Sequence, residues 1–317
     1  MKITTFVMLF ILFNQILFAQ DRKDELGKIV RKSIDSGSFY QYVPPKYKKP
    51  VEFIVFTHGS LRDEKQDASE VAEYYVKTLQ PMVNLAGVIL IVPIFDQYNY
   101  GGYSGPLGGY RGCEGRTIGA DVFVNQIMDG YKEQIKSYDG KFHLMGHSAG
   151  GQFTCSYISK HPERIKTATL IAPGVFMFFD EKIPFPYGIG RGYWGMDWPG
   201  AKETIYDYTP DSNKLNMMVQ LPILVVAGEK DISHKDSLDG QIGDTRLARA
   251  QSWVVELKKY AQKIGVESKV EFSLVKGAGH NDHSLFKTAW NRVFKTKIKV
   301  EIGNVISVKK IKIYRRL

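Results

Sequence analysis

The chain has 317 residues, of which 44% are hydrophobic and 24% are charged, so it is not a largely disordered protein. Its 30 Gly and 13 Pro show no Gly-X-Y period, which excludes collagen, and two Cys exclude a disulfide-dense miniprotein and a four-thiolate zinc site. The net charge of +10 is concentrated in residues 295–317, whose eight Lys or Arg face a single Glu and leave +3 elsewhere, so no nucleic-acid-binding face is expected on the main body.

The N-terminus (residues 1–20) has the form of a secretory signal peptide. Lys2 supplies the positive charge, the run from Phe6 to Phe18 is mostly apolar, and Ala19 offers a small residue for cleavage. The run is short for a membrane span, and an uncleaved anchor is the alternative. We therefore expect a secreted or periplasmic protein with no stable membrane insertion after cleavage.

Within residues 21–294, short β-branched runs alternate with segments of helical spacing. Most of the runs are apolar over five or more residues, as strands covered on both faces require, so a parallel sheet is expected. The alternation predicts one α/β domain built on a doubly wound sheet. The expected strands are Val51–Thr57, Val88–Ile94, Lys141–His147, Lys166–Ile171, Leu221–Ala227 and Val270–Val275, and the expected helical stripes start at Val71, Phe123 and Leu247.

Two long insertions interrupt the alternation, and loops of this length inside a compact domain are usually functional. Residues 96–116 are rich in Gly and Tyr, and residues 175–216 are dense in aromatics and are expected to form a lid or cap. Two interpretations stay open for their aromatic side chains: they line an acyl or alcohol pocket, or they pack the insertions' own small cores. The residues concerned are Tyr98, Tyr100, Tyr103, Trp194 and Trp198.

The C-terminal tail (residues 295–317) alternates charged and apolar residues around Gly303-Asn304, which predicts a β-hairpin. Its charge either contacts anionic glycans, lipid head groups or another protein, or is the solvated edge of two strands. The two cysteines are open to two interpretations as well. In an oxidising compartment Cys113 and Cys155 could pair, whereas a small buried Cys on a helix is also common.

The strongest motif is the sequence GHSAGG at residues 146–151, which follows an expected strand and precedes a helical segment. This is G-x-S-x-G in the strand–turn–helix context of a nucleophile elbow. The turn strains the backbone of Ser148, whose Cβ crowds the residues two before and two after it, and Gly146 and Gly150 remove that clash. The alternative is a glycine-rich turn in which Ser148 only caps the helix.

A serine nucleophile needs a base, and the base needs an orienting carboxylate. Asp231 stands just past the run Pro222–Ala227, 83 residues after Ser148, and His280 follows the run Val270–Val275 on a glycine-rich turn. The order Ser, Asp, His with each residue at a strand end predicts a catalytic triad. The alternatives are Asp236 or Asp239 for the acid and His283 for the base.

Acyl transfer also needs hydrogen-bond donors for the oxyanion. One is expected to be the backbone N–H of Ala149, directly after the nucleophile. The other is expected to be the backbone N–H of Ser60, because the His58-Gly59 step lets the chain turn toward the elbow as it leaves the first core strand. His58 itself is expected to shape this loop rather than act as a second base.

From about Ser38 to Lys295, these motifs resemble those of secreted serine hydrolases of the α/β-hydrolase fold. The segment Tyr40–Pro44 is similar to extracellular polyester depolymerases and feruloyl esterases. The resemblance implies Ser148 as nucleophile, His280 as base and Asp231 as orienting acid. It also implies the α/β-hydrolase fold, whose mostly parallel doubly wound sheet would here carry the aromatic-rich insertion after its sixth core strand and the C-terminal β-hairpin tail.

The function that follows is a carboxylic ester hydrolase that forms an acyl-enzyme on small or polymeric esters. Two alternatives stay open: a serine peptidase similar to the prolyl oligopeptidase group, and a non-catalytic binding protein of the same fold. Against the peptidase, the roughly 30 mature residues before the first core strand cannot form a propeller gate. Ser148 stands where dehalogenases of this fold have Asp, and Ser60 where an HGGG-type loop has Gly. No cofactor or metal is expected, because the sequence lacks a G-x-G-x-x-G after the first expected strand and an H-E-x-x-H.

Overall fold

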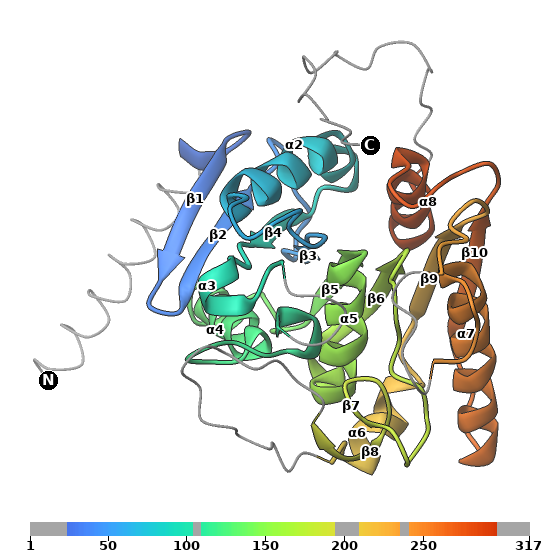
Figure 1. The fold of residues 1–317 in the computed structure, drawn as a ribbon. Coiled ribbons are helices and arrows are strands. Elements are labelled where there is room, and N and C mark those ends of the chain that lie inside the picture. Colours follow the sequence, from blue (N-terminus) through green and yellow to red (C-terminus); the bar gives the residue numbers. More distant parts are fainter. Residues whose placement is uncertain (1–23, 104–108, 194–208, 235–240, 297–317) are drawn as a thin grey trace, which may run out of the picture.

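The structure is a computed structural model that describes residues 24–103, 109–193, 209–234 and 241–296. An eight-stranded sheet forms its centre (Figure 1). The two strands at one edge pair antiparallel and the other six run parallel, which confirms the predicted mostly parallel sheet. In spatial order the strands are β1 (Ile29–Ile34), β2 (Gly37–Tyr42), β4 (Ile89–Pro93), β3 (Phe53–Thr57), β5 (Phe142–His147), β6 (Ile165–Ile171), β9 (Ile223–Gly228) and β10 (Val270–Val275).

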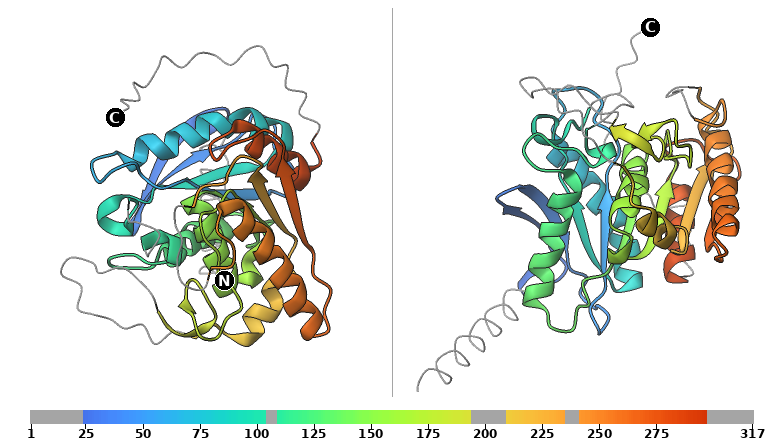
Figure 2. Two further views of the ribbon diagram at one scale, coloured as in Figure 1. Left: turned by 45° about the vertical axis from the view of Figure 1, so that its right-hand side comes forward. Right: turned by 90° about the horizontal axis from the view of Figure 1, so that it is seen from below.

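Helices cover both faces of this sheet. Figure 2 shows, in its left view, α2 (Ala68–Ala86) and α8 (His283–Phe294) on one side, and α5 (Ala149–Lys160) and α7 (Arg246–Lys263) on the other, the side on which α4 (Ala120–Gln134) also packs. Shorter elements complete the described chain: α3 (Gln97–Tyr100), η1 (Gly109–Gly112), η2 (Pro162–Arg164), α6 (Ser212–Met218) and a two-stranded sheet of β7 (Pro184–Phe185) and β8 (Gly190–Tyr193).

The strands β3, β4 and β9 are almost entirely apolar because each of them supplies two cores. On β3, Phe53 and Val55 belong to the core under α4, α5 and α7, whereas Ile54 and Phe56 belong to the core under α2 and α8. Successive side chains of a strand point to opposite faces, so a strand between two helical layers has no polar face. This packing explains why the six expected strands lie where the apolar runs are.

The helix ends follow local signals in the sequence. The side chain of Asp67 accepts a hydrogen bond from the backbone N–H of Ser69 at the start of α2, and Gly87 ends the helix with φ of 65°. Such a left-handed residue at a helix C-terminus is usually glycine, because a Cβ is disfavoured there. Similar Asp caps begin α6, at Asp211, and α8, at Asp282.

Besides the short elements α3, η1, η2, β7 and β8, four elements of the described chain were not expected from the sequence: β1, β2, α6 and α8. The first two form an edge hairpin in which burial alternates along the strand, so neither has a long apolar run. α8 does carry a helical signal, with Leu285, Phe286, Ala289 and Trp290 buried at steps of one, three and one.

Several sequence expectations fall on residues outside the described ranges. They are the signal peptide, Trp194, Trp198, and the basic tail from residue 297 onward. In the part of the chain that is described, no helix combines the length and hydropathy needed to cross a membrane. Both Cys113 and Cys155 are buried free thiols, not a disulfide. Cys155 lies on the helix α5, as the second interpretation expects, whereas Cys113 is buried on a turn after η1.

Candidate active site

Ser148 stands on a sharp turn between β5 and α5. Its φ of 54° and ψ of −114° lie in a strained region for a non-glycine residue, and its backbone N–H donates to the carbonyl of Ile171 at 2.8 Å. A Cβ on Gly146 would lie 2.0 Å from the carbonyl oxygen of Gly150, and one on Gly150 would lie 2.1 Å from that of Thr57. The two glycines are therefore required because main-chain oxygen atoms of the turn and of β3 leave no room for a Cβ. From the sequence, the Ser148 side chain was expected to cause this crowding, but the main chain causes it.

The structure brings the three predicted side chains together. The Nε2 atom of His280 lies 3.0 Å from the Oγ atom of Ser148, and its Nδ1 atom lies 2.8 Å from the Oδ2 atom of Asp231. A carboxylate only accepts hydrogen bonds, so Nδ1 carries the proton and Nε2 faces the serine hydroxyl with its lone pair. This is the hydroxyl–imidazole–carboxylate arrangement needed to activate a serine.

Parallel strands explain this convergence. β5, β9 and β10 run in the same direction, so the segments after their carboxyl ends meet at one edge of the sheet. Asp231 is 3% exposed, and its Oδ1 atom lies 3.8 Å from the guanidinium of Arg246. Of the alternatives, Asp236 and Asp239 lie outside the described residues, and His283 faces the hydroxyl of Tyr74 at 3.1 Å.

The turn after β3 passes directly beside the nucleophile. A Cβ built on Gly59 would lie 3.6 Å from the Cβ of Ser148, and Ser60 is the next residue along this turn. Ala149 opens α5 on the other side of Ser148, where the unpaired N–H groups of a helix start carry partial positive charge. Gly59 and Ala149 therefore lie next to Ser148, and Ser60 follows Gly59 along the chain.

His58 shapes this turn, in line with its expected role. It is fully buried, its Nδ1 atom lies 2.7 Å from the carbonyl oxygen of Gly59, and its Nε2 atom accepts from the N–H of Phe95 at 3.1 Å. Burial lowers the pKa of His58 to about 4, with the charge of Arg111 acting in the same direction and the hydrogen bond to Gly59 opposing it. A neutral ring with both nitrogens occupied is a spacer between two loops.

Two buried side chains for which no role was expected from the sequence, His147 and Tyr75, lie beside Ser148 and His280. His147 precedes the nucleophile, and its Nε2 atom lies 3.0 Å from the main-chain carbonyl oxygen of His280. The hydroxyl of Tyr75, on α2, lies 2.8 Å from the Nδ1 atom of His147. Tyr75 looks in sequence like any apolar member of a helical stripe, so no local signal pointed to this contact.

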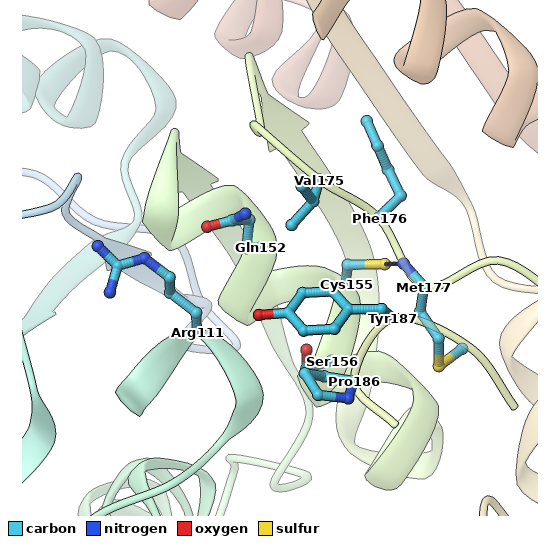
Figure 3. A pocket seen from close by; sticks show the side chains of 9 residues that line it. All are labelled: Arg111, Gln152, Cys155, Ser156, Val175, Phe176, Met177, Pro186 and Tyr187. Carbon is cyan, nitrogen blue, oxygen red and sulfur yellow. Dashed lines mark hydrogen bonds between the residues drawn. The ribbon is translucent and has the colours of Figure 1, made fainter. Parts of the chain in front are cut away.

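A small cavity of about 10 Å³ lies beside the elbow helix (Figure 3). Its polar side has Arg111 from η1 and Gln152 from α5, and the hydroxyl end of Tyr187 is directed toward them, whereas Val175 and Phe176 lie opposite. This volume holds about one water molecule, so the cavity as it stands does not hold a substrate. The cavity is close to Ser148 along the chain: the backbone N–H of Gln152, one of its lining residues, donates to the carbonyl of Ser148 at 3.1 Å.

The aromatic residues of the first insertion divide between packing and exposure. Tyr100 is 1% exposed and stacks on Phe123 at 5.3 Å between ring centroids, so the core-packing interpretation holds for it. Tyr98 is 67% exposed beneath the guanidinium of Arg116, and Tyr103 is 42% exposed. Among the described residues, no group of three or more His, Cys, Asp or Glu side chains is arranged to hold a metal ion.

Comparisons with known proteins support the fold. A family model described as "alpha/beta hydrolase fold" matches residues 94–209. A poly(3-hydroxybutyrate) depolymerase from Bordetella parapertussis has a similar structure, with a TM-score of 0.65 and 20% identity over 87% of this chain and 92% of that one. Poly(aspartic acid) hydrolase-1 from Sphingomonas sp. KT-1 is similar with a TM-score of 0.64 and 17% identity, over 84% and 97% of the two chains.

An S-formylglutathione hydrolase from Agrobacterium tumefaciens is also similar, with a TM-score of 0.51 and 15% identity over 84% of this chain and 92% of that one. Comparison with curated protein sequences gives no match. Identities this low carry the fold and not the substrate. At the level of the fold the predicted resemblance is confirmed: the mostly parallel eight-stranded sheet with helices on both faces agrees with the α/β-hydrolase fold.

Proposed function

We propose that this protein, which has the α/β-hydrolase fold, hydrolyses carboxylic esters through an acyl-enzyme on Ser148. The observation that carries the proposal is the pair of distances at His280, 3.0 Å to the Ser148 hydroxyl and 2.8 Å to the Asp231 carboxylate. Hydrogen bonds of this length on a strained strand–helix turn favour a reactive serine over a helix cap.

In the proposed reaction, the Oγ atom of Ser148 attacks the ester carbonyl carbon while Nε2 of His280 takes the hydroxyl proton. The tetrahedral intermediate places its oxyanion toward the N–H groups of Ala149 and Ser60. His280 then gives the proton to the leaving alcohol as the ester bond breaks. A water molecule repeats the sequence on the acyl-enzyme and releases the acid, and Asp231 stabilises the imidazolium in both halves.

Esters are the first choice because one similar structure is named a depolymerase of poly(3-hydroxybutyrate), a polyester. The substrate would be a small or polymeric ester, with no cofactor and no nucleic acid. The name of a second neighbour, poly(aspartic acid) hydrolase, supports an amide substrate as the alternative, since the same triad serves amide cleavage.

The test is a panel of short p-nitrophenyl esters, a polyester and peptides, assayed with the native protein and with Ser148→Ala. We expect ester turnover and labelling by a fluorophosphonate probe in the native protein, and the loss of both in Ser148→Ala. The control is Ser252→Ala on α7, which should keep both. Undiminished ester turnover in folded Ser148→Ala would overturn the proposal, and peptide cleavage without ester turnover would favour the amide alternative.

We also propose that the protein is exported, on the strength of the apolar run after Lys2 and the small residue Ala19. Expression in a bacterial host followed by cell fractionation should place the protein in the periplasm or the medium. N-terminal sequencing should find a mature chain that starts at Gln20 or Asp21. Recovery of full-length protein in the membrane fraction would favour the uncleaved anchor instead.

A further inference from the structure

A continuous set of contacts links the elbow, the base loop and the turn after β3. The hydroxyl of Tyr75 lies 2.8 Å from Nδ1 of His147, and Nε2 of His147 lies 3.0 Å from the carbonyl oxygen of His280. A Cβ on Gly59 would lie 3.2 Å from the Tyr75 hydroxyl and 3.5 Å from Nδ1 of His147. One buried tyrosine–histidine pair thus contacts two loops that carry proposed catalytic groups.

We propose that Tyr75 and His147 are positioning residues that hold the His280 loop and the turn at Gly59 in register with Ser148. The proposal rests on the proposed hydrolase function and deepens it. Neither side chain takes part in bond making. Their task is to fix the main chain from which the base and one oxyanion donor project.

The direction of each hydrogen bond follows from the chemistry of its ends. A main-chain carbonyl only accepts, so Nε2 of His147 must carry the proton that it donates to His280. The Nδ1 atom of the neutral ring is then an acceptor, and the Tyr75 hydroxyl donates to it. The two hydrogen bonds are compatible with one tautomer only, and therefore they reinforce each other.

Burial keeps His147 in this neutral form. Desolvation lowers the pKa of His147 to about 4, and the electrostatic interaction with the His280 ring acts in the same direction, although the bond to the His280 carbonyl and the charge of Asp231 oppose it. Arg246 also disfavours a second proton, and Tyr75 faces the ring from α2. Burial likewise raises the pKa of Tyr75, so its hydroxyl keeps its proton.

Packing makes the pair a rigid support. The ring of Tyr75 lies 5.0 Å from that of Phe56 on β3 and 6.0 Å from that of Phe286 on α8. Phe286 also contacts His147 at 5.1 Å between ring centroids. Side chains held in this way have one rotamer available, so they can hold a loop to within a fraction of an ångström.

The base loop needs such a support because of its own sequence. His280 follows Gly277-Ala278-Gly279, and a Cβ on either glycine would meet nothing within 4 Å. The N–H of Gly277 donates to Glu229 and the carbonyl of Ala278 accepts from Lys230, both at 2.8 Å, so the loop is held before it reaches His280. Packing around the two glycines does little to restrict the main chain, and glycine adds conformational freedom. The bond from His147 fixes the carbonyl of His280 itself. Loss of it would let the imidazole drift from Ser148, and a misplacement of about 1 Å can cost about 100-fold in rate.

The test compares full-length variants on a short p-nitrophenyl ester and by their rate of inactivation with a fluorophosphonate. Tyr75→Phe removes the hydroxyl, and His147→Leu removes both ring nitrogens. We expect kcat to fall about 10-fold in the first and about 100-fold in the second, with KM within about threefold of the native value. His147→Gln keeps a donor near the position of Nε2 and should retain kcat within about fivefold.

Tyr74→Phe is the matched control, because this neighbouring tyrosine is 47% exposed and bonds His283 instead. It should match the native protein. A merely structural role would lower the melting temperature of the Tyr75 and His147 variants and leave kcat per folded molecule unchanged. That result, with Ser148→Ala inactive, would overturn the positioning role and leave the proposed function standing. If His147→Leu does not fold, Tyr75→Phe and His147→Gln decide.

The proposed function fails in a different way. In that case the native protein itself would turn over no ester or peptide and would not react with the fluorophosphonate. The positioning role would then fall with it, because there would be no reaction for the base loop to support. The native protein and Ser148→Ala are therefore measured in the same series.

Discussion

The described part of the chain contains two pairs of a buried aspartate and a half-buried histidine, with the same separation and different surroundings. His280 and Asp231 lie 2.8 Å apart at the carboxyl edge of the sheet, and His161 and Asp121 lie 2.8 Å apart where α5 ends beside the start of α4. Both carboxylates are nearly inaccessible, at 3% and 2% exposure. The pair alone therefore does not identify an active site.

What differs is the second nitrogen of each ring. That of His280 faces the hydroxyl of Ser148, whereas that of His161 faces the carboxylate of Glu163 at 3.8 Å. Asp121 also binds the ammonium of Lys160 at 2.7 Å. An acid near a helix N-terminus and cations at a helix C-terminus both suit the helix dipole, so the second pair ties two helices together.

The largest effect is expected from a substitution of Asp231, the carboxylate of the first pair. In Asp231→Asn the side chain can donate to Nδ1 of His280, which would put the ring in the wrong tautomer for Ser148. We expect kcat for a p-nitrophenyl ester to fall about 10³- to 10⁴-fold with little change in melting temperature. Steady-state kinetics on the purified variant measures it. Activity within tenfold of native would mean that Asp231 does not orient the base.

The elbow is the feature that the second pair lacks, and Gly150→Ala tests it. The new Cβ would lie 2.1 Å from the carbonyl oxygen of Thr57, against a main chain that cannot move without β3. We expect a loss of about 3 kcal/mol or more in the free energy of unfolding, or no folded protein.

Gly130→Ala on α4 is the control for this substitution, because its new Cβ would meet nothing within 4 Å. It should stabilise the protein by about 0.5–1 kcal/mol, since alanine is the better helix former. Urea denaturation followed by circular dichroism compares the two. Equal stability of the two variants would contradict the tight packing of the elbow.

The second pair is expected to act on stability and not on rate. Asp121→Asn keeps the shape of the side chain and removes its charge beside Lys160 and His161. We expect the free energy of unfolding to fall by about 1–3 kcal/mol while kcat stays within about twofold of native. Chemical denaturation and an ester assay on the same sample measure both quantities. The reverse result, a slow enzyme of native stability, would place this pair in the active site.

The smallest effect is the pH dependence that Asp121 contributes. Burial alone would raise its pKa, but the hydrogen bond from His161 and the charge of Lys160 outweigh burial and lower the pKa in the folded state. The stabilisation is therefore present above the unfolded pKa of about 3.9 and is lost as the pH falls through the lower folded value. The stability difference between the native protein and Asp121→Asn should narrow from pH 7 to pH 3. A constant difference would contradict this sign.

The sequence alone predicts those parts of the fold that depend on the pattern of residues within a short stretch of the chain. Strands buried on both faces are long apolar runs, and β3, β5 and β9 lie within two residues of the expected bounds. The convergence of Ser148, Asp231 and His280 could be predicted from their order alone, because parallel strands bring the segments after their carboxyl ends to one edge. Each of these features has a signature within a short window of the chain.

The remaining features depend on contacts between distant segments. β1 and β2 have no long apolar run because they form an edge hairpin, so periodicity does not distinguish them from a loop. The contact between Tyr75 and His147 joins residues 72 positions apart, and either would look the same in sequence if it only packed the core. The contact between Tyr75 and His147 depends on the tertiary fold and has no local sequence pattern.

The buried thiols of Cys113 and Cys155 can be used to measure unfolding of the protein. Burial raises the pKa of Cys155 to about 12 and that of Cys113 well above its usual range, and Sγ of Cys155 already accepts from the N–H of Met177. A thiolate is the reactive species, so an alkylating reagent should modify neither residue in the native protein. The number of alkylated sulfurs per chain, read by mass spectrometry, would then count the molecules that have opened, with no added dye and no engineered label.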